Sequence, residues 1–131
     1  QVVQVVRAAE ADEAAAGVRI GLIHTPGMDS DYKSAFMALN VTNETYFQTE
    51  VPDDFQLPLA SKLLAMSNTV DVIVAVCDTN DQEMLRGFQT VALNTNVPIV
   101  PACATPKGEI PKVADQAVQM AEIRQQALMG G

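Results

Sequence analysis

The segment from residue 51 to residue 76 limits the possible folds more than any other part of the chain, because it predicts a helix and a strand in a fixed order. Residues Leu57–Met66 carry apolar side chains at helical spacing, and Pro58 suits the first helical turn, where a missing N–H has no partner to lose. Residues 71–76 then form an apolar run typical of a strand buried on both faces of a parallel sheet. The predicted apolar stripe of this helix is Leu57, Leu59, Ala60, Leu63 and Leu64. The segment therefore predicts a strand, a helix and a second, parallel strand.

The rest of the chain continues this alternation. Further strands are predicted at residues 18–23, 44–51 and 97–102, and further helices at residues 31–40, 81–94 and 112–129. Thr79 and Gln82 have the spacing of a capping box before the helix at 81–94. Pro98 and Pro101 cannot donate to a strand ladder, so the last strand is expected at an edge. This order predicts a three-layer α/β/α sandwich with a four-stranded parallel sheet.

Two parts are expected along the chain, an amino-terminal arm at residues 1–17 and a single α/β domain at residues 18–129. The arm begins with Val2, Val3, Val5 and Val6, which favour pairing with the sheet of a neighbouring subunit, although a solvated arm is the competing interpretation. The chain begins at Gln1 without a methionine, which predicts an upstream segment, such as a targeting peptide, that was either removed or left out of the sequence.

Charge and composition exclude several functional classes. The net charge of -8 would repel phosphate backbones, so we expect no nucleic-acid partner. No apolar run approaches the ~20 residues that span a bilayer. Cys77 and Cys103 follow predicted buried strands and are expected to be reduced thiols.

In parallel sheets the ligand crevice lies beyond the carboxyl ends of the strands, so we expect any site in the loops that start at His24, Pro52, Cys77 and Cys103. The loop after the first strand could bind a phosphate group, but Asp29 and Asp31 favour a capped helix start instead. His24 is the only histidine and has no second histidine or thiolate pair, so we predict no metal site.

The acidic residues in these loops have two interpretations, as part of a phosphoacceptor site or as helix caps. Asp53, Asp54, Asp78, Thr105 and Lys107 are reminiscent of a phosphoacceptor receiver domain, but such a domain needs acids directly after its first strand, where this chain has His24 and Thr25. The acids are therefore expected to cap helices and face solvent.

Cys77 could be a nucleophile with His24 as its base, but a small buried thiol is favoured. Phe55 lies on a turn at the same edge, where an aromatic ring packs against a ligand or against a neighbouring subunit.

The run VPDDFQLPLASKLL followed by VDVIVAV resembles the V-P-G-[AS]-F-E-[LI]-P-x-A-A-K-x-[LM] segment of lumazine synthase, the penultimate enzyme of riboflavin biosynthesis. VRIGLI resembles the opening strand of that family, EMLRGFQTVALNTNVPIV its later helix-turn-strand segment, and residues 112–123 its closing helix. The resemblance covers residues 18–123 and implies a flavodoxin-like, lumazine-synthase-like fold. It also implies assembly as a pentamer with sites between neighbouring subunits.

The family's catalytic features are missing from this chain. Pro26, Gly27 and Met28 replace the ring-stacking R-F-N motif, and Gln56 replaces the glutamate of the ribityl-binding turn. The long segment that binds phosphate and carries the acid/base histidine is reduced to residues 77–81. The later segment with the phosphate-clamping arginine is also shortened, although Lys112 matches the family's lysine.

We therefore predict no catalytic residues and no bound cofactor, and we expect a non-catalytic subunit of a larger assembly, either a homopentamer or a single copy docked on other proteins. The alternatives are a flavin- or lumazine-binding module that stacks a ring on Phe55, residual lumazine synthase activity, and a divergent enzyme using His24, Asp78 and Cys77. The candidate ligand or interface residues at the strand ends are His24, Thr25, Phe55, Gln56, Cys77, Asp78 and Thr105. By analogy with plastidic riboflavin synthesis, a plastid or another organelle is the expected location.

Overall fold

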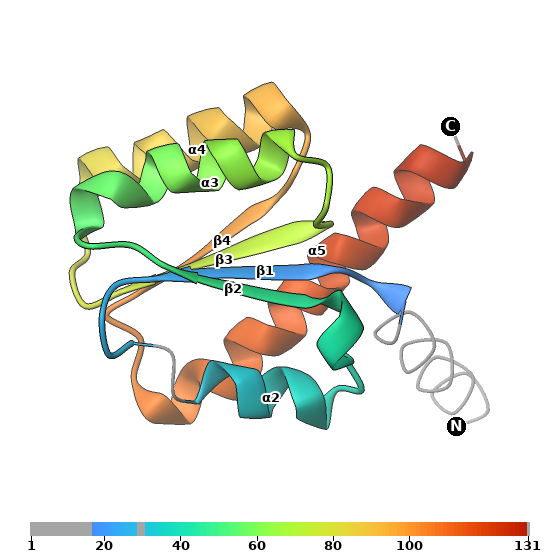
Figure 1. Cartoon of the computed structure of the whole chain (residues 1–131), viewed down its shortest axis with the longest axis horizontal. Helices are drawn as coiled ribbons and strands as arrows, with labels where there is room; N and C mark the ends of the chain where they lie inside the picture. Colours follow the sequence, from blue (N-terminus) through green and yellow to red (C-terminus); the bar gives the residue numbers. More distant parts are fainter. Residues whose placement is uncertain (1–16, 29–30, 131) are drawn as a thin grey trace.

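A computed structural model describes residues 17–28 and 31–130 as one α/β unit (Figure 1). The predicted arm at residues 1–17 lies, apart from Gly17, outside the described residues, and so does Asp29. The strands are β1 (Ile20–His24), β2 (Tyr46–Glu50), β3 (Val72–Cys77) and β4 (Ile99–Cys103). The α-helices are α2 (Tyr32–Ala38), α3 (Leu57–Met66), α4 (Gln82–Thr95) and α5 (Ile110–Gly130). Short 3₁₀ turns lie at Asn43–Thr45, Asp54–Gln56 and Lys107–Glu109.

The four strands form one parallel sheet in the order β2-β1-β3-β4. This order confirms the predicted fold class and is the doubly wound order of flavodoxin-like sheets. Among the described strands, β4 pairs only with β3, so the expected edge position of the proline-containing strand is confirmed. β3 is buried along its whole length, as its unbroken apolar sequence predicts.

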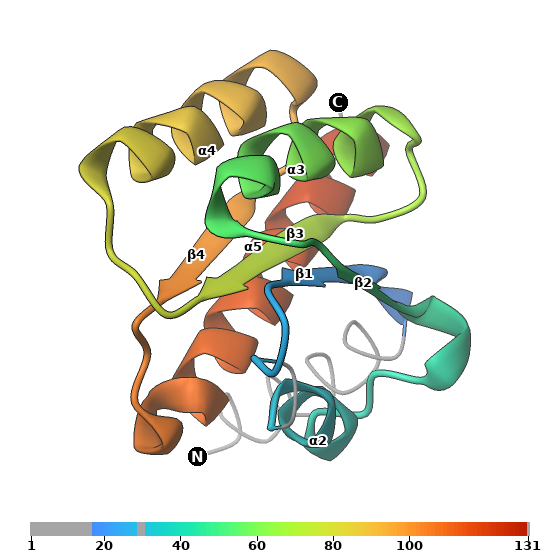
Figure 2. The same cartoon turned by 60° about the vertical axis from the view of Figure 1, so that its left-hand side comes forward.

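Two apolar clusters lie on the two faces of the sheet. One packs beneath α2 and α5 and includes Leu22, Phe36 and Val74, and the other packs beneath α3 and α4 and includes Ile23, Leu57 and Phe88. Figures 1 and 2 show α3 and α4 side by side over one face, with α2 and α5 on the other. The division follows from strand geometry, because successive side chains point to opposite faces.

Gly21 allows α3 to approach β1 closely. A Cβ atom at this position would lie 2.7 Å from Leu64 Cδ2, closer than Cβ atoms come to other atoms in proteins, and a tight 3.1 Å from Val70 Cγ1. The glycine thus lets the α3 layer rest directly on the centre of the sheet.

The predicted apolar stripe of α3 is wrong for two of its members. Leu57 is buried and Leu64 is partly buried against the core, but Leu59 and Leu63 are each more than half exposed. At 100° per residue, positions 57, 61 and 64 fall on one face of the helix, and positions 59, 63 and 66 fall on the opposite face. The helix therefore has an apolar outer face as well as an apolar inner face.

Two helix starts also differ from the sequence prediction. Asp81, not Thr79, is the N-cap of α4, because its extended backbone lets Oδ1 accept from the Glu83 N–H at 2.8 Å. Asp31 precedes α2 in a helical conformation, in which its carboxylate makes no capping bond, and it instead lies 3.7 Å from Lys107 Nζ. Asp31 therefore does not cap α2, and Asp29, the other expected acid, lies outside the described residues.

Candidate functional site

The predicted site residues lie at the carboxyl edge of the sheet, where His24 ends β1, Cys77 ends β3 and Cys103 ends β4. Figure 2 shows this edge together with the first turns of α3 and α4 that lie above it. The alternation of strands and helices places these segments together, since every parallel strand ends at the same edge.

His24 and Cys77 do not come together at this edge. Ile73, Ala75 and Cys77 belong to the cluster beneath α3 and α4, whereas Leu22 belongs to the cluster beneath α2 and α5. His24 follows Leu22 by two residues and shares its face of the sheet. The hypothesis of a nucleophile and base formed by Cys77 and His24 is therefore wrong, because the sheet separates the two side chains.

The His24 ring is held by its neighbours and is almost completely buried. Its Nδ1 lies 2.9 Å from the carbonyl oxygen of Thr25, which can only accept, so Nδ1 donates in this bond. Its Nε2 lies 3.4 Å from the side-chain nitrogen of Gln48, which can donate to it. Both ring nitrogens are engaged within the fold, and the ring ties β1 to β2.

A pocket of about 650 Å³ opens at the carboxyl edge between the starts of α3 and α4. We call it the carboxyl-edge pocket. Its apolar lining consists of Phe55, Pro58, Leu59 and Met84, and its polar lining consists of Asp54, Thr79, Asp81 and Glu83. Phe55 is 78% exposed, so a large ring stands at the mouth of the pocket without being covered by the described part of the chain.

The charges of the carboxyl-edge pocket disfavour anionic ligands. Three of the residues that line it are carboxylates, and none is a lysine, arginine or histidine. Asp81 already accepts the free N–H of Glu83 at the start of α4, and Thr79 Oγ1 donates to Asp54 Oδ2 at 2.5 Å. The helix start that could hold a phosphate group is therefore capped by a carboxylate.

The remaining predicted residues are scattered around this edge. Gln56 and Asp78 are exposed, and Lys112 lies exposed on α5 outside the pocket. Thr105 is half-buried and makes a side-chain hydrogen bond with Tyr32. Burial raises the pKa of the Tyr32 hydroxyl, and this hydrogen bond partly offsets the rise. These residues do not form one constellation with the pocket.

Two free thiols lie side by side beneath the edge. Cys77 Sγ donates toward Cys103 Sγ at 3.1 Å and lies 3.2 Å from the carbonyl oxygen of Thr79. Burial, together with the hydrogen bond to Cys77, raises the pKa of the Cys103 thiol to about 12. Ala104, the next residue, has a φ of 58°, a left-handed conformation that alanine rarely adopts.

Sequence reasoning missed a charged cluster at the opposite, amino edge of the sheet. Asp71 is buried just before β3, and its carboxylate accepts from the Arg19 side chain at 3.0 Å, the Arg124 side chain at 2.9 Å and the Gln125 amide at 2.9 Å. The Arg19 backbone N–H also donates to it at 3.0 Å. An acid directly before a fully apolar strand was the signal in the sequence, but its partners come from distant segments.

Hydrogen bonds to Asp71 stabilise its charged form. Burial alone would raise the pKa of this carboxyl group, but the hydrogen bonds from Arg19 and Gln125 outweigh burial and lower the pKa below 3.8. The cluster joins the strands β1 and β3 to α5 and leaves the carboxylate surrounded by donors.

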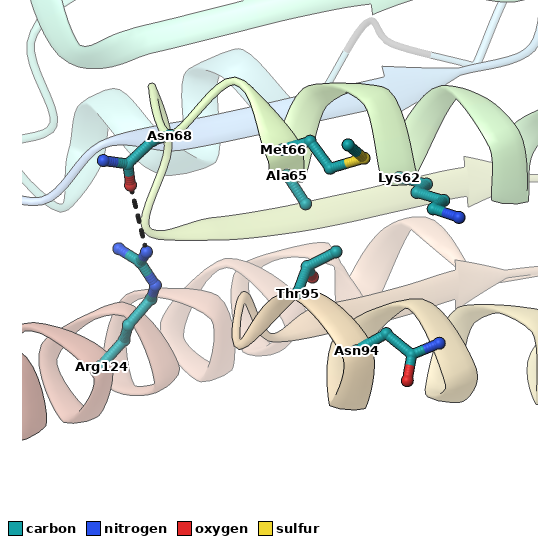
Figure 3. Close-up of a pocket in the computed structure, with 7 residues that line it drawn as sticks. All are labelled: Lys62, Ala65, Met66, Asn68, Asn94, Thr95 and Arg124. Atoms are coloured by element: carbon teal, nitrogen blue, oxygen red, sulfur yellow. Dashed lines mark hydrogen bonds between the residues drawn. The ribbon is translucent and has the colours of Figure 1, made fainter.

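A pocket of about 520 Å³ lies near this cluster, between the ends of α3 and α4 (Figure 3). Arg124 reaches into it and donates to the Asn68 side chain at 3.3 Å, to the Asn96 carbonyl at 3.0 Å and to Asp71. The helices present their carbonyl ends here, where a cation is favoured, and Arg124 supplies that cation. The arrangement is that of a structural contact between layers.

No described group of three or more histidine, cysteine, aspartate or glutamate side chains is arranged to hold a metal ion. Within the described ranges, no helix combines the length and the apolar character needed to cross a membrane. Comparison with known protein families and with curated protein sequences finds no match for this chain.

Proposed function

We propose that this chain is a non-catalytic, lumazine-synthase-like subunit of a larger assembly and that it binds a protein partner at the carboxyl-edge pocket. The observation that carries the proposal is the composition of that pocket. It combines an exposed aromatic ring and an apolar lining with a rim of carboxylates, at the edge where a parallel α/β sheet usually binds its ligand. The doubly wound strand order and the sequence resemblance support the link to lumazine synthase.

Charge and geometry support the proposal that the chain is not catalytic. Binding of a phosphorylated substrate requires cationic side chains or free N–H groups, whereas the described lining of the pocket supplies three carboxylates and a capped helix start. His24, the single histidine, points to the other face of the sheet and is held by Thr25 and Gln48. We expect the purified chain to form no lumazine from ribitylaminopyrimidine and the four-carbon phosphate ketone above the buffer rate, measured by absorbance. Formation above that rate would refute this part of the proposal.

An exposed apolar stripe on α3 extends the proposed docking surface. Leu59, Leu63 and Met66 follow one another along the outer face of the helix, Phe55 lies on the 3₁₀ turn just before it, and each of the four is more than half exposed. Single exposed apolar residues are ordinary, but a row of them next to an apolar pocket is typical of a protein interface and supports the proposal. We call these four residues the α3 stripe.

Charge complementarity indicates the chemistry of the partner. Asp54, Asp81 and Glu83 border the pocket, and the whole chain carries a net charge of -8. A surface that presents an apolar side chain flanked by lysine or arginine would bury the stripe and pair with the carboxylates. Two copies of this chain facing each other through the pocket would instead oppose like charges. We therefore propose a different, basic protein as the occupant rather than a second copy.

Native isolation tests the subunit role. Material purified from its source without denaturation, analysed by native mass spectrometry and by size-exclusion chromatography with light scattering, is expected to contain this chain in a larger complex. A ring of identical copies would contradict the basic partner but keep the assembly role. A free monomer in both measurements would overturn the proposal.

Paired variants test the docking surface. The double variant Phe55→Ser, Leu59→Ser is expected to weaken the complex by about tenfold or more, since buried aromatic anchors dominate interface energy. Leu93→Ser is the matched control, because Leu93 is 74% exposed on α4 but lines neither the pocket nor the stripe. Asp81→Asn with Glu83→Gln should weaken binding mainly at low salt. Equal losses for the control and the double variant would contradict the assignment.

A flavin-binding module is the second candidate, and Phe55 is the observation that favours it. Its exposed ring offers one stacking face in a pocket large enough for a ring system. Titration of riboflavin and of dimethylribityllumazine with the chain, followed by fluorescence, distinguishes the two functions. Quenching that Phe55→Ser abolishes would establish ring binding in place of a protein partner.

A further inference from the structure

Cys77 and Cys103 occupy matched positions on neighbouring strands. They are the last residues of β3 and β4 and are paired in register, and the Ala104 N–H donates to the Cys77 carbonyl at 2.8 Å directly beyond them. Adjacent strands lie about 4.8 Å apart, within the roughly 4.4–6.8 Å that a disulfide requires between Cα atoms. The backbone thus already holds both residues at a bonding distance.

The side chains complete this arrangement. Both belong to or pack against the cluster beneath α3 and α4, and their sulfur atoms are 3.1 Å apart. Cys77 is fully buried, whereas Cys103 is partly exposed and is therefore the thiol that a reagent in solution can reach. Only a small approach of the two sulfur atoms would be needed to form a bond.

We propose that this pair is a dithiol site that forms a reversible disulfide by exchange with low-molecular-weight disulfides. The Cys103 thiolate attacks one sulfur of the reagent and releases the first thiol, giving a mixed disulfide on Cys103. Cys77 then attacks the Cys103 sulfur and releases the second thiol. The reagent disulfide is reduced to two thiols, the two cysteines are oxidised to one disulfide, and their two protons pass to the released thiols.

The environment of the site sets its speed and its consequence. Because the thiolate is the attacking species and burial disfavours it at Cys103, exchange is slow at neutral pH and accelerates by about tenfold per pH unit. Oxidation also removes the S–H group next to the Thr79 carbonyl, at the base of the loop that lines the carboxyl-edge pocket. The site does not depend on the proposed docking function.

The test uses the purified full chain equilibrated at pH 8.5 with glutathione and glutathione disulfide over a range of ratios. Thiols are then alkylated with N-ethylmaleimide in denaturant and counted by intact mass. The expected product is a monomer that takes up no N-ethylmaleimide and carries no glutathione. Its peptide map should contain a disulfide-linked pair of peptides that joins Cys77 to Cys103. Cys103→Ala, a substitution at the partly exposed position, should give no such product and should leave one thiol.

Three results of this assay would overturn the proposal. They are two alkylated thiols at every ratio, a stable mixed disulfide with glutathione, and dimers linked between chains. The oxidised chain should also unfold less readily, with an unfolding constant lower by on the order of 100-fold, since the bond closes the loop that contains α4. An oxidised chain less stable than the reduced one would show that the fold does not preorganise the bond.

Discussion

The amino edge and the carboxyl edge of the sheet use their polar side chains in opposite ways. At the amino edge, Asp71 accepts from Arg19, Arg124 and Gln125, and the cluster is largely buried. At the carboxyl edge, carboxylates surround an open apolar pocket, and Phe55 is exposed. One edge satisfies its charges internally, whereas the other leaves its charges and apolar surface available to a partner.

This difference separates stability from function within one small fold. Removing one partner from a buried, hydrogen-bonded charge cluster strongly destabilises a protein, so substitutions at the amino edge are expected to lower stability. Substitutions at exposed positions usually alter stability little, so the carboxyl edge can be altered without unfolding the chain. The following predictions test this division, from the largest expected effect on stability to the smallest.

Removing the central carboxylate of the amino edge should have the largest effect. Asp71→Ala leaves two arginines without their shared anion and is expected to lower the free energy of unfolding by about 3–5 kcal/mol, measured by urea denaturation. Asp78→Ala, an exposed acid at the carboxyl edge, is the matched control and should change it by less than about 0.5 kcal/mol. Similar losses for both variants would erase the contrast between the edges.

The pH dependence of unfolding should report the same carboxylate. The pKa of Asp71 is lowered in the folded state, so its contribution to stability is fully present above pH 3.8, the ordinary pKa of an aspartate. This contribution is lost as the pH falls from 3.8 through the lower folded-state pKa. Urea denaturation of the parent chain and of Asp71→Asn between pH 2 and pH 6 should show the stability difference narrowing below 3.8. A constant difference across this range would mean that another group carries the acid sensitivity.

Relieving backbone strain at the carboxyl edge should stabilise the chain. The left-handed conformation of Ala104 costs about 1–2 kcal/mol because of its Cβ atom, and Ala104→Gly removes this strain. Glycine also raises the entropy of the unfolded chain, which opposes the gain by about 0.5–1 kcal/mol. A net gain of roughly 0.5–1 kcal/mol is expected in the same denaturation assay. Ala102→Gly, at a buried position within β4, should instead lower stability.

The smallest effect is expected at the most exposed ring. Phe55→Ser should change the free energy of unfolding by less than about 0.5 kcal/mol, because the native chain leaves this ring in water. Phe88→Ala, which removes a buried ring from the core beneath α4, is the contrasting variant and should lower it by about 3–5 kcal/mol. A large loss for Phe55→Ser would show that its ring supports the fold rather than a binding surface.

Local patterns were sufficient to predict most of the fold. The apolar run of β3 and the spacing of Leu57–Met66 identified a strand and a helix whose positions agree with the structure to within a residue or two. The exposure of Leu59 and Leu63 was not predicted, because two apolar stripes on opposite faces of a short helix produce nearly the same spacing as one broad stripe.

The candidate site was predicted only in its location. The loops at the carboxyl edge could be identified from the strand ends, and Phe55 lies there as expected. The separation of His24 from Cys77 depends on which face of the sheet each side chain occupies. A shift of a single residue in a strand reverses that face, and sequence-based strand ends are uncertain by more than this.

By itself, the sequence determined the alternation of strands and helices, and therefore the parallel sheet and the edge that carries the loops. Tertiary structure alone decided which distant side chains meet, as in the cluster of Asp71 with Arg19 and Arg124 and in the pair Cys77 and Cys103. Periodicity is a local property of a few turns or residues, whereas these contacts depend on strand order and register, which the packing of the whole chain determines.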